Sequence, residues 1–142
     1  MISGYLPLLA GLLIATPAAH ADSMPDITGV WATGSEGGKV EIYRCDDALC
    51  GRIVDADALR ENPDQLDVRN SDRSLRDRRL DGLVVLQDFS GGPREWEGGP
   101  VYDPQSGDGA RNGELRLRED GSLEVKGCVA FFCRTRVWTR AD

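Results

Sequence analysis

Histidine is almost absent from this sequence of 142 residues. The single histidine, His20, lies close to the start of the chain. Nucleophilic sites of the Ser-His-Asp and Cys-His kinds need an imidazole, and so do histidine-ligated zinc and iron sites. We therefore expect a protein that is not an enzyme, with no catalytic residue, no metal ligand set and no cofactor.

A long apolar run is also missing. The run from Leu6 to Ala15 is shorter than the roughly 20 residues that a membrane-spanning helix needs. Pro17 and the small-residue triplet Ala19-His20-Ala21 follow it, which is typical of a secretory signal peptide. We expect a signal peptide over residues 1–21, a mature domain over residues 22–142 and a periplasmic or secreted location. No Lys or Arg precedes the apolar run, so an uncleaved anchor is the alternative; otherwise no membrane span is expected after cleavage.

Basic residues are fewer than acidic ones. The sequence has 17 Lys and Arg against 24 Asp and Glu, a formal net charge of −7. Such a surface repels phosphate backbones and anionic lipid heads, so we expect no nucleic-acid partner. The sequence leaves the oligomeric state open.

Four cysteines stand in two pairs, Cys45 with Cys50 and Cys128 with Cys133. An even number in an exported chain indicates disulfides. Three connectivities are possible, and we favour the two local pairs, because each pair lies where two strand-like runs meet. A four-thiolate zinc site is the alternative, although such sites usually have two residues between paired cysteines.

The hydrophobic pattern has a period of two, as in Lys39 to Arg44 and Glu114 to Arg118, which is typical of half-buried antiparallel strands. Glycine, proline and aspartate clusters separate these runs, which favours a closed barrel or a sandwich. The segment Asp57 to Asp81 is instead dense in Asp and Arg and predicts a long connection or a helical turn across the barrel rim. The predicted strands are 28–33, 38–45, 50–56, 82–89, 94–102, 112–118, 122–129 and 133–140.

The last predicted strand places Arg134, Arg136 and Arg140 on one face with Trp138. This face is either an anion-binding strip or a set of arginines that pair with the many acids and cover Trp rings, and we favour the second. The three tryptophans could likewise line a cavity or fill a core, and we favour a core. A pair of acids for glycoside cleavage is a weaker hypothesis, because no motif selects two among Asp55, Asp57, Asp67, Asp103 and Glu97.

Several motifs together resemble the bacterial DUF2147 family of exported proteins of unknown function. They are Gly29-Val30-Trp31, the hairpin Val40 to Ile53, the charged stretch Leu66 to Leu83, Trp96 to Pro104, and Arg134-Thr135 with Trp138-Thr139-Arg140. The resemblance implies an all-β fold: an up-and-down antiparallel, lipocalin-like barrel of about eight strands with one long charged connection. It also implies that Trp31 packs at the closed end beneath Arg140. The chain departs from the family at Asp108-Gly109-Ala110 and at Arg136, where Gln is common.

A lipocalin-like barrel suggests a binding protein, and we expect a small apolar or amphipathic ligand. The alternative is an envelope protein–protein interaction module that acts through the connection 57–81. The candidate pocket residues are Leu86, Phe89, Trp96 and Tyr102, with Asn70, Arg76 and Arg78 at the rim.

Overall fold

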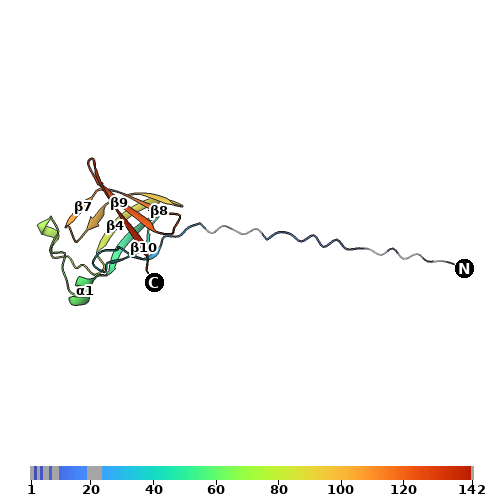
Figure 1. The fold of residues 1–142 in the computed structure, drawn as a ribbon, viewed down its shortest axis with the longest axis horizontal. Coiled ribbons are helices and arrows are strands. Elements are labelled where there is room, and N and C mark those ends of the chain that lie inside the picture. Colours follow the sequence, from blue (N-terminus) through green and yellow to red (C-terminus); the bar gives the residue numbers. More distant parts are fainter. Residues whose placement is uncertain (1, 3, 5–6, 8–9, 19–23, 142) are drawn as a thin grey trace.

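The computed structural model of the chain describes residues 2, 4, 7, 10–18 and 24–141. Residues 10–18 contain no helix or strand and run away from the folded part (Figure 1). The expected cleavage site, Ala19-His20-Ala21, lies outside the described residues. No helix within the described ranges has the length and apolar character to cross a bilayer.

The folded part is one antiparallel sheet that closes on itself (Figure 1). Consecutive strands pair from β1 to β5, from β6 to β7 and from β8 to β10, while β5 also pairs with β8 and β6 with β4. The β1–β10 pairing closes an eight-stranded barrel, in which β5 with β6 and β7 with β8 each form one interrupted strand. The sandwich alternative is therefore wrong, and the all-β, lipocalin-like barrel is confirmed. The strands are β1 (Gly29–Ala32), β2 (Lys39–Cys45), β3 (Ala48–Asp55), β4 (Val84–Gly91), β5 (Glu95–Gly98), β6 (Val101–Asp103), β7 (Asp108–Ala110), β8 (Asn112–Leu117), β9 (Leu123–Val129) and β10 (Phe132–Arg140).

The predicted strand 94–102 is divided into β5 and β6. The two pieces still lie on one line, since β5 pairs with β8 and β6 pairs with β7 in the same register. The break falls at Gly99 and Pro100. A Cβ on Gly99 would lie 1.8 Å from the carbonyl oxygen of Gln87, so only glycine fits there. Pro100 has no N–H to donate to the ladder. The other seven predicted strands match β1, β2, β3, β4, β8, β9 and β10 with ends shifted by at most two residues.

Two disulfides close hairpin turns at opposite ends of the barrel. Cys45–Cys50 spans the β2–β3 turn, and Cys128–Cys133 spans the β9–β10 turn, where the two cysteines face each other across the ladder. The local pairing is confirmed. A shared four-thiolate zinc site is wrong, because the sulfurs are bonded in pairs and the pairs lie at different ends.

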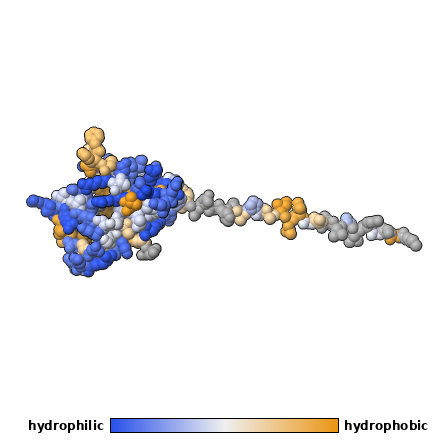
Figure 2. Space-filling model, viewed as in Figure 1, coloured by the Kyte–Doolittle hydropathy of each residue, from blue (hydrophilic) through white to orange (hydrophobic). Residues whose placement is uncertain are grey.

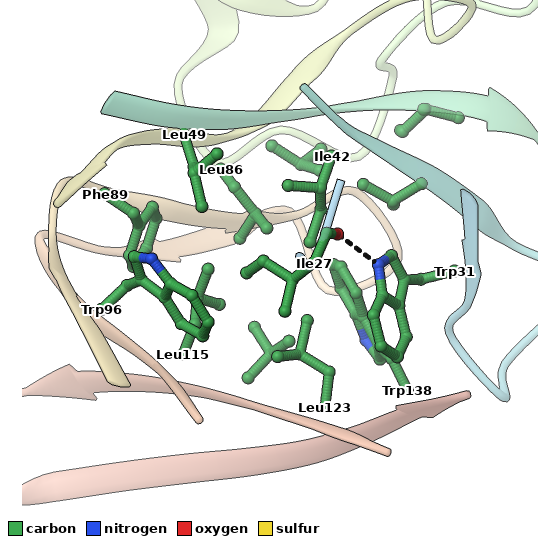
Figure 3. Close-up of a cluster of buried hydrophobic side chains, with 14 of the residues drawn as sticks. Ile27, Trp31, Ile42, Leu49, Leu86, Phe89, Trp96, Leu115, Leu123 and Trp138 are labelled. Atoms are coloured by element: carbon green, nitrogen blue, oxygen red, sulfur yellow. Dashed lines mark hydrogen bonds between the residues drawn. The ribbon is translucent and has the colours of Figure 1, made fainter. Parts of the chain in front are cut away.

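The hydrophobic core fills the end of the barrel where the chain enters and leaves the sheet (Figure 3). Trp31 is fully buried, and its indole nitrogen donates a hydrogen bond of 2.9 Å to the carbonyl of Ile27. The Arg140 guanidinium lies 4.3 Å from the centre of the Trp31 ring and donates to the carbonyls of Asp26 and Thr28. This end is therefore closed, with Trp31 beneath Arg140 as the resemblance implies.

The β3–β4 connection crosses the opposite end. It contains α1 (Asp57–Glu61), a 3-10 turn (Arg73–Leu75) and an isolated bridge between Leu66 and Arg79. The sequence prediction of a long connection with helical turns at the barrel rim matches this arrangement. The connection, the 104–107 turn and the β9–β10 hairpin together surround the mouth of the barrel.

Candidate functional site

A cavity of about 670 Å³ opens at the mouth. Its floor is the top of the hydrophobic core, where buried apolar side chains from several strands meet. These floor residues line the cavity and belong to the core at the same time: Val40, Ile53, Val85, Val125 and Trp138. The strand alternation thus produces an apolar floor, because every second residue of each strand points inward.

The long connection forms one wall of the cavity. Residues 66–69 lie along it, next to Tyr102 of β6 and the turn 104–107. The turn is pressed against the connection: a Cβ on Gly107 would lie 1.7 Å from the carbonyl oxygen of Arg69, and the Gly107 carbonyl accepts a hydrogen bond from the Ser71 N–H. The connection is thereby fixed over the mouth by backbone contacts.

A buried carboxylate joins this wall to the barrel. Asp67 is 1% exposed and accepts a 2.6 Å hydrogen bond from the Tyr102 hydroxyl and one of 2.9 Å from the Asn70 amide. The Arg78 guanidinium lies 3.1 Å from the same carboxylate and 5.6 Å from the centre of the Tyr102 ring. Burial and the hydrogen bond to Asp67 raise the pKa of Tyr102 well above its usual value. Tyr102 is therefore a neutral donor that holds the carboxylate in place.

The opposite wall comes from β9 and β10. Phe132, Arg134 and Arg136 line the cavity together with Trp138, so this face of β10 is turned toward the cavity, with Trp138 buried and the other three exposed. Their partners on β9 are Val129, Gly127, Val125 and Leu123, none of which is charged. The arginines that share a face with Trp138 in the sequence thus point into the cavity.

The tip of the β9–β10 hairpin is apolar and projects beyond the mouth (Figure 2). Phe131 is 98% exposed and Phe132 is 82% exposed. Phe132 also belongs to the cavity wall, so the projecting tip adjoins the entrance.

The predicted pocket residues separate into two groups. Tyr102 lines the cavity. Leu86, Phe89 and Trp96 are buried in the core instead, with Phe89 and Trp96 packed together toward the closed end (Figure 3). The sequence shows that these side chains face inward, but their depth along the barrel places them below the cavity floor.

The predicted rim residues act within the connection. Asn70 is buried against Asp67, the Arg76 guanidinium donates to the Asn70 carbonyl, and Arg78 binds Asp67. Arg79 binds Asp64 in the same way. Recognition of an envelope protein through this segment stays a prediction, and these internal bonds do not favour it.

Three of the five acids considered for hydrolysis, Asp55, Asp57 and Asp67, are bound by arginines. The Arg60 guanidinium nitrogens lie 2.6 Å from a carboxylate oxygen of Asp55 and 2.7 Å from one of Asp57. Hydrogen bonding to Arg60 lowers the pKa of Asp55, whereas a general acid needs a raised pKa. These contacts do not provide the protonated acid that glycoside cleavage requires.

The fold and its cavity define the class of the protein as a lipocalin-like barrel. A similar solved structure is protein HP1028 from the human pathogen Helicobacter pylori, which is described as belonging to the lipocalin family. The likeness covers 83% of this chain and 84% of that one, with a TM-score of 0.68 and 20% sequence identity. No curated protein matches the sequence. The family model for an uncharacterized protein conserved in bacteria, DUF2147, matches residues 29–140, and the chain belongs to this family.

Proposed function

We propose that the protein is an exported binding protein that holds a small apolar or amphipathic molecule in the mouth cavity. The observation that carries the proposal is the cavity of about 670 Å³ with an apolar floor. Typical small-molecule pockets have volumes of about 300–1,000 Å³ and are lined mainly by apolar side chains. A ligand seated here would cover Val40, Val125 and Trp138 and remove their apolar surface from water.

Export is part of the same proposal. Disulfides persist mainly in oxidising compartments, and this domain has two of them. The test is N-terminal sequencing of the protein isolated from the cell envelope or the medium. A mature terminus at Asp22 is the expected result, and a terminus at Met1 would contradict cleavage.

The binding proposal is tested by native mass spectrometry of the protein purified from the envelope of its source organism. We expect a mass excess that disappears on denaturation. Ala110→Trp places a large ring in the cavity, because Ala110 lines it, and the excess should be lost. Val84→Trp is the matched control, since Val84 is on β4, is 40% exposed and does not line the cavity. A mass excess that survives Ala110→Trp would place the ligand elsewhere.

A further inference from the structure

The inner face of β10 carries two positive charges above an apolar floor. Arg134 and Arg136 line the cavity, and Trp138, two residues further along the same face, forms part of its floor. Residues two apart on a strand are separated by about 7 Å, so both guanidinium groups can reach one headgroup. Both side chains are exposed to solvent, so their guanidinium groups are accessible to a ligand that enters the cavity.

These two arginines have no acidic partner in the described part of the chain. No carboxylate lies within ion-pair distance of either one, and neither takes part in a side-chain hydrogen bond there. By contrast, the basic residues with an acidic partner are Lys39, Arg52, Arg60, Arg78, Arg79, Arg116, Arg118 and Lys126.

The carboxylates of the cavity wall are mostly engaged elsewhere. Asp55 binds Arg60 and Lys39, and Asp67 binds Arg78 and Tyr102. Asp103 accepts a hydrogen bond from the backbone N–H of Gln105. The remaining wall carboxylates, Glu36 and Asp108, are exposed on the rim. Of the other basic residues that line the cavity, Lys39 pairs with Asp55, and Arg69 donates a hydrogen bond to the Gln105 carbonyl. Arg134 and Arg136 are therefore the lining cations without a partner among the described residues, and the rim acids disfavour an anion at the entrance itself.

We propose that the cavity selects amphiphiles with an anionic headgroup, a carboxylate or a phosphate, which Arg134 and Arg136 hold while the apolar tail covers Trp138. The inference rests on the proposed function and names its ligand class. Guanidinium groups bind carboxylates and phosphates through paired N–H donors, and such charge-assisted bonds are stronger than neutral ones. An alcohol of the same chain length makes the same apolar contacts without this bonding.

The test compares three probes with one alkyl chain: dodecanoate, dodecyl phosphate and dodecanol. Their affinities for the purified protein are measured by isothermal titration calorimetry below the micellar concentrations. One charge-assisted hydrogen bond corresponds to a preference of about 10- to 150-fold. We expect at least one of the two anions to bind at least tenfold tighter than dodecanol, and the tighter anion identifies the headgroup.

The variant is Arg134→Gln with Arg136→Gln, and its matched control is Arg116→Gln with Lys126→Gln. Both double variants remove two positive charges, but Arg116 and Lys126 lie on the outer faces of β8 and β9 and pair with Glu95 and Glu114. We expect the inner variant to lose the anion preference while its dodecanol affinity is unchanged, which also shows that its cavity is intact. The outer variant should keep the preference.

The outcomes separate the two proposals. Equal binding of anions and dodecanol, an anion preference that survives in the inner variant, or equal losses in both variants would each overturn the anionic-headgroup inference and leave the binding function standing. Failure of every probe, dodecanol included, to bind the unmodified protein would overturn both.

Discussion

The contact between Tyr102 and Asp67 leads to a quantitative prediction about the wall of the cavity. Tyr102→Phe removes the 2.6 Å hydrogen bond from the Tyr102 hydroxyl to Asp67, a residue that is 1% exposed. One oxygen of the Asp67 carboxylate then lacks the hydroxyl donor. Hydrogen bonds to charged groups contribute about 1.5–3 kcal/mol. Because Asp67 belongs to the connection and Tyr102 to the barrel, this free energy stabilises the docking of the connection over the mouth.

The assay is limited trypsin digestion, with cleavage inside residues 57–81 followed by mass spectrometry. This segment is rich in arginine, and cleavage of a transiently opened segment follows its open population. A loss of 1.5–3 kcal/mol raises that population by about 10- to 150-fold. We therefore expect Tyr102→Phe to accelerate cleavage in the connection by at least tenfold.

Tyr43→Phe is the matched control. The Tyr43 ring lies under Arg52, 4.6 Å from the guanidinium carbon to the ring centre, and its hydroxyl makes no hydrogen bond to any described residue. Removal of that hydroxyl should leave the cleavage rate within twofold of the unmodified protein. If Tyr102→Phe and Tyr43→Phe give the same rate, the Asp67 contact does not hold the connection and the reasoning is wrong.

Three further measurements test other contacts. In the mature chain from Asp22 that carries Tyr43→Phe, Tyr102 is the remaining tyrosine, and a spectrophotometric titration should show no phenolate near pH 10 while the protein is folded. The unfolded phenol ionises first, so stability falls as the pH rises above 10.0, and a normal transition would refute the raised pKa. Replacement of Cys128 and Cys133 by serine should lower the unfolding free energy in urea by about 2 kcal/mol, because the disulfide closes a short loop; an unchanged midpoint would contradict this. Arg140→Ala should cost about 2 kcal/mol in thermal unfolding and Arg140→Lys less, since lysine keeps a donor but loses the planar stacking; equal losses would contradict a contribution from the retained donor.

Local sequence patterns determined most of the barrel. Alternating runs such as Lys39 to Arg44 became strands because one face of each could be buried, and the aspartates at 46 and 47 supplied a tight turn where Asp46 adopts a positive φ of 54°. The same locality made the disulfides predictable, since each joins residues of one hairpin. These features depend on neighbours in the chain, so the sequence contains them directly.

The cavity depended on information that no local pattern holds. Alternation shows that Phe89, Trp96 and Tyr102 belong to inward-facing sets, but not at what depth each one lies. Barrel closure and strand register set that depth, and they placed Phe89 and Trp96 in the closed end and Tyr102 at the mouth. Of the four predicted pocket residues, Tyr102 therefore lines the cavity, whereas Leu86, Phe89 and Trp96 lie in the core below it.

The orientation of β10 shows the same limit most clearly. By itself the sequence determined that Arg134 and Arg136 share a face with Trp138, and it made pairing with acids the simpler interpretation. Only the tertiary structure decided that this face is the inner one, because Trp138 is buried against the core and its whole face must turn inward with it. Two charges thus line a cavity whose existence depends on strands from the entire chain closing into one barrel.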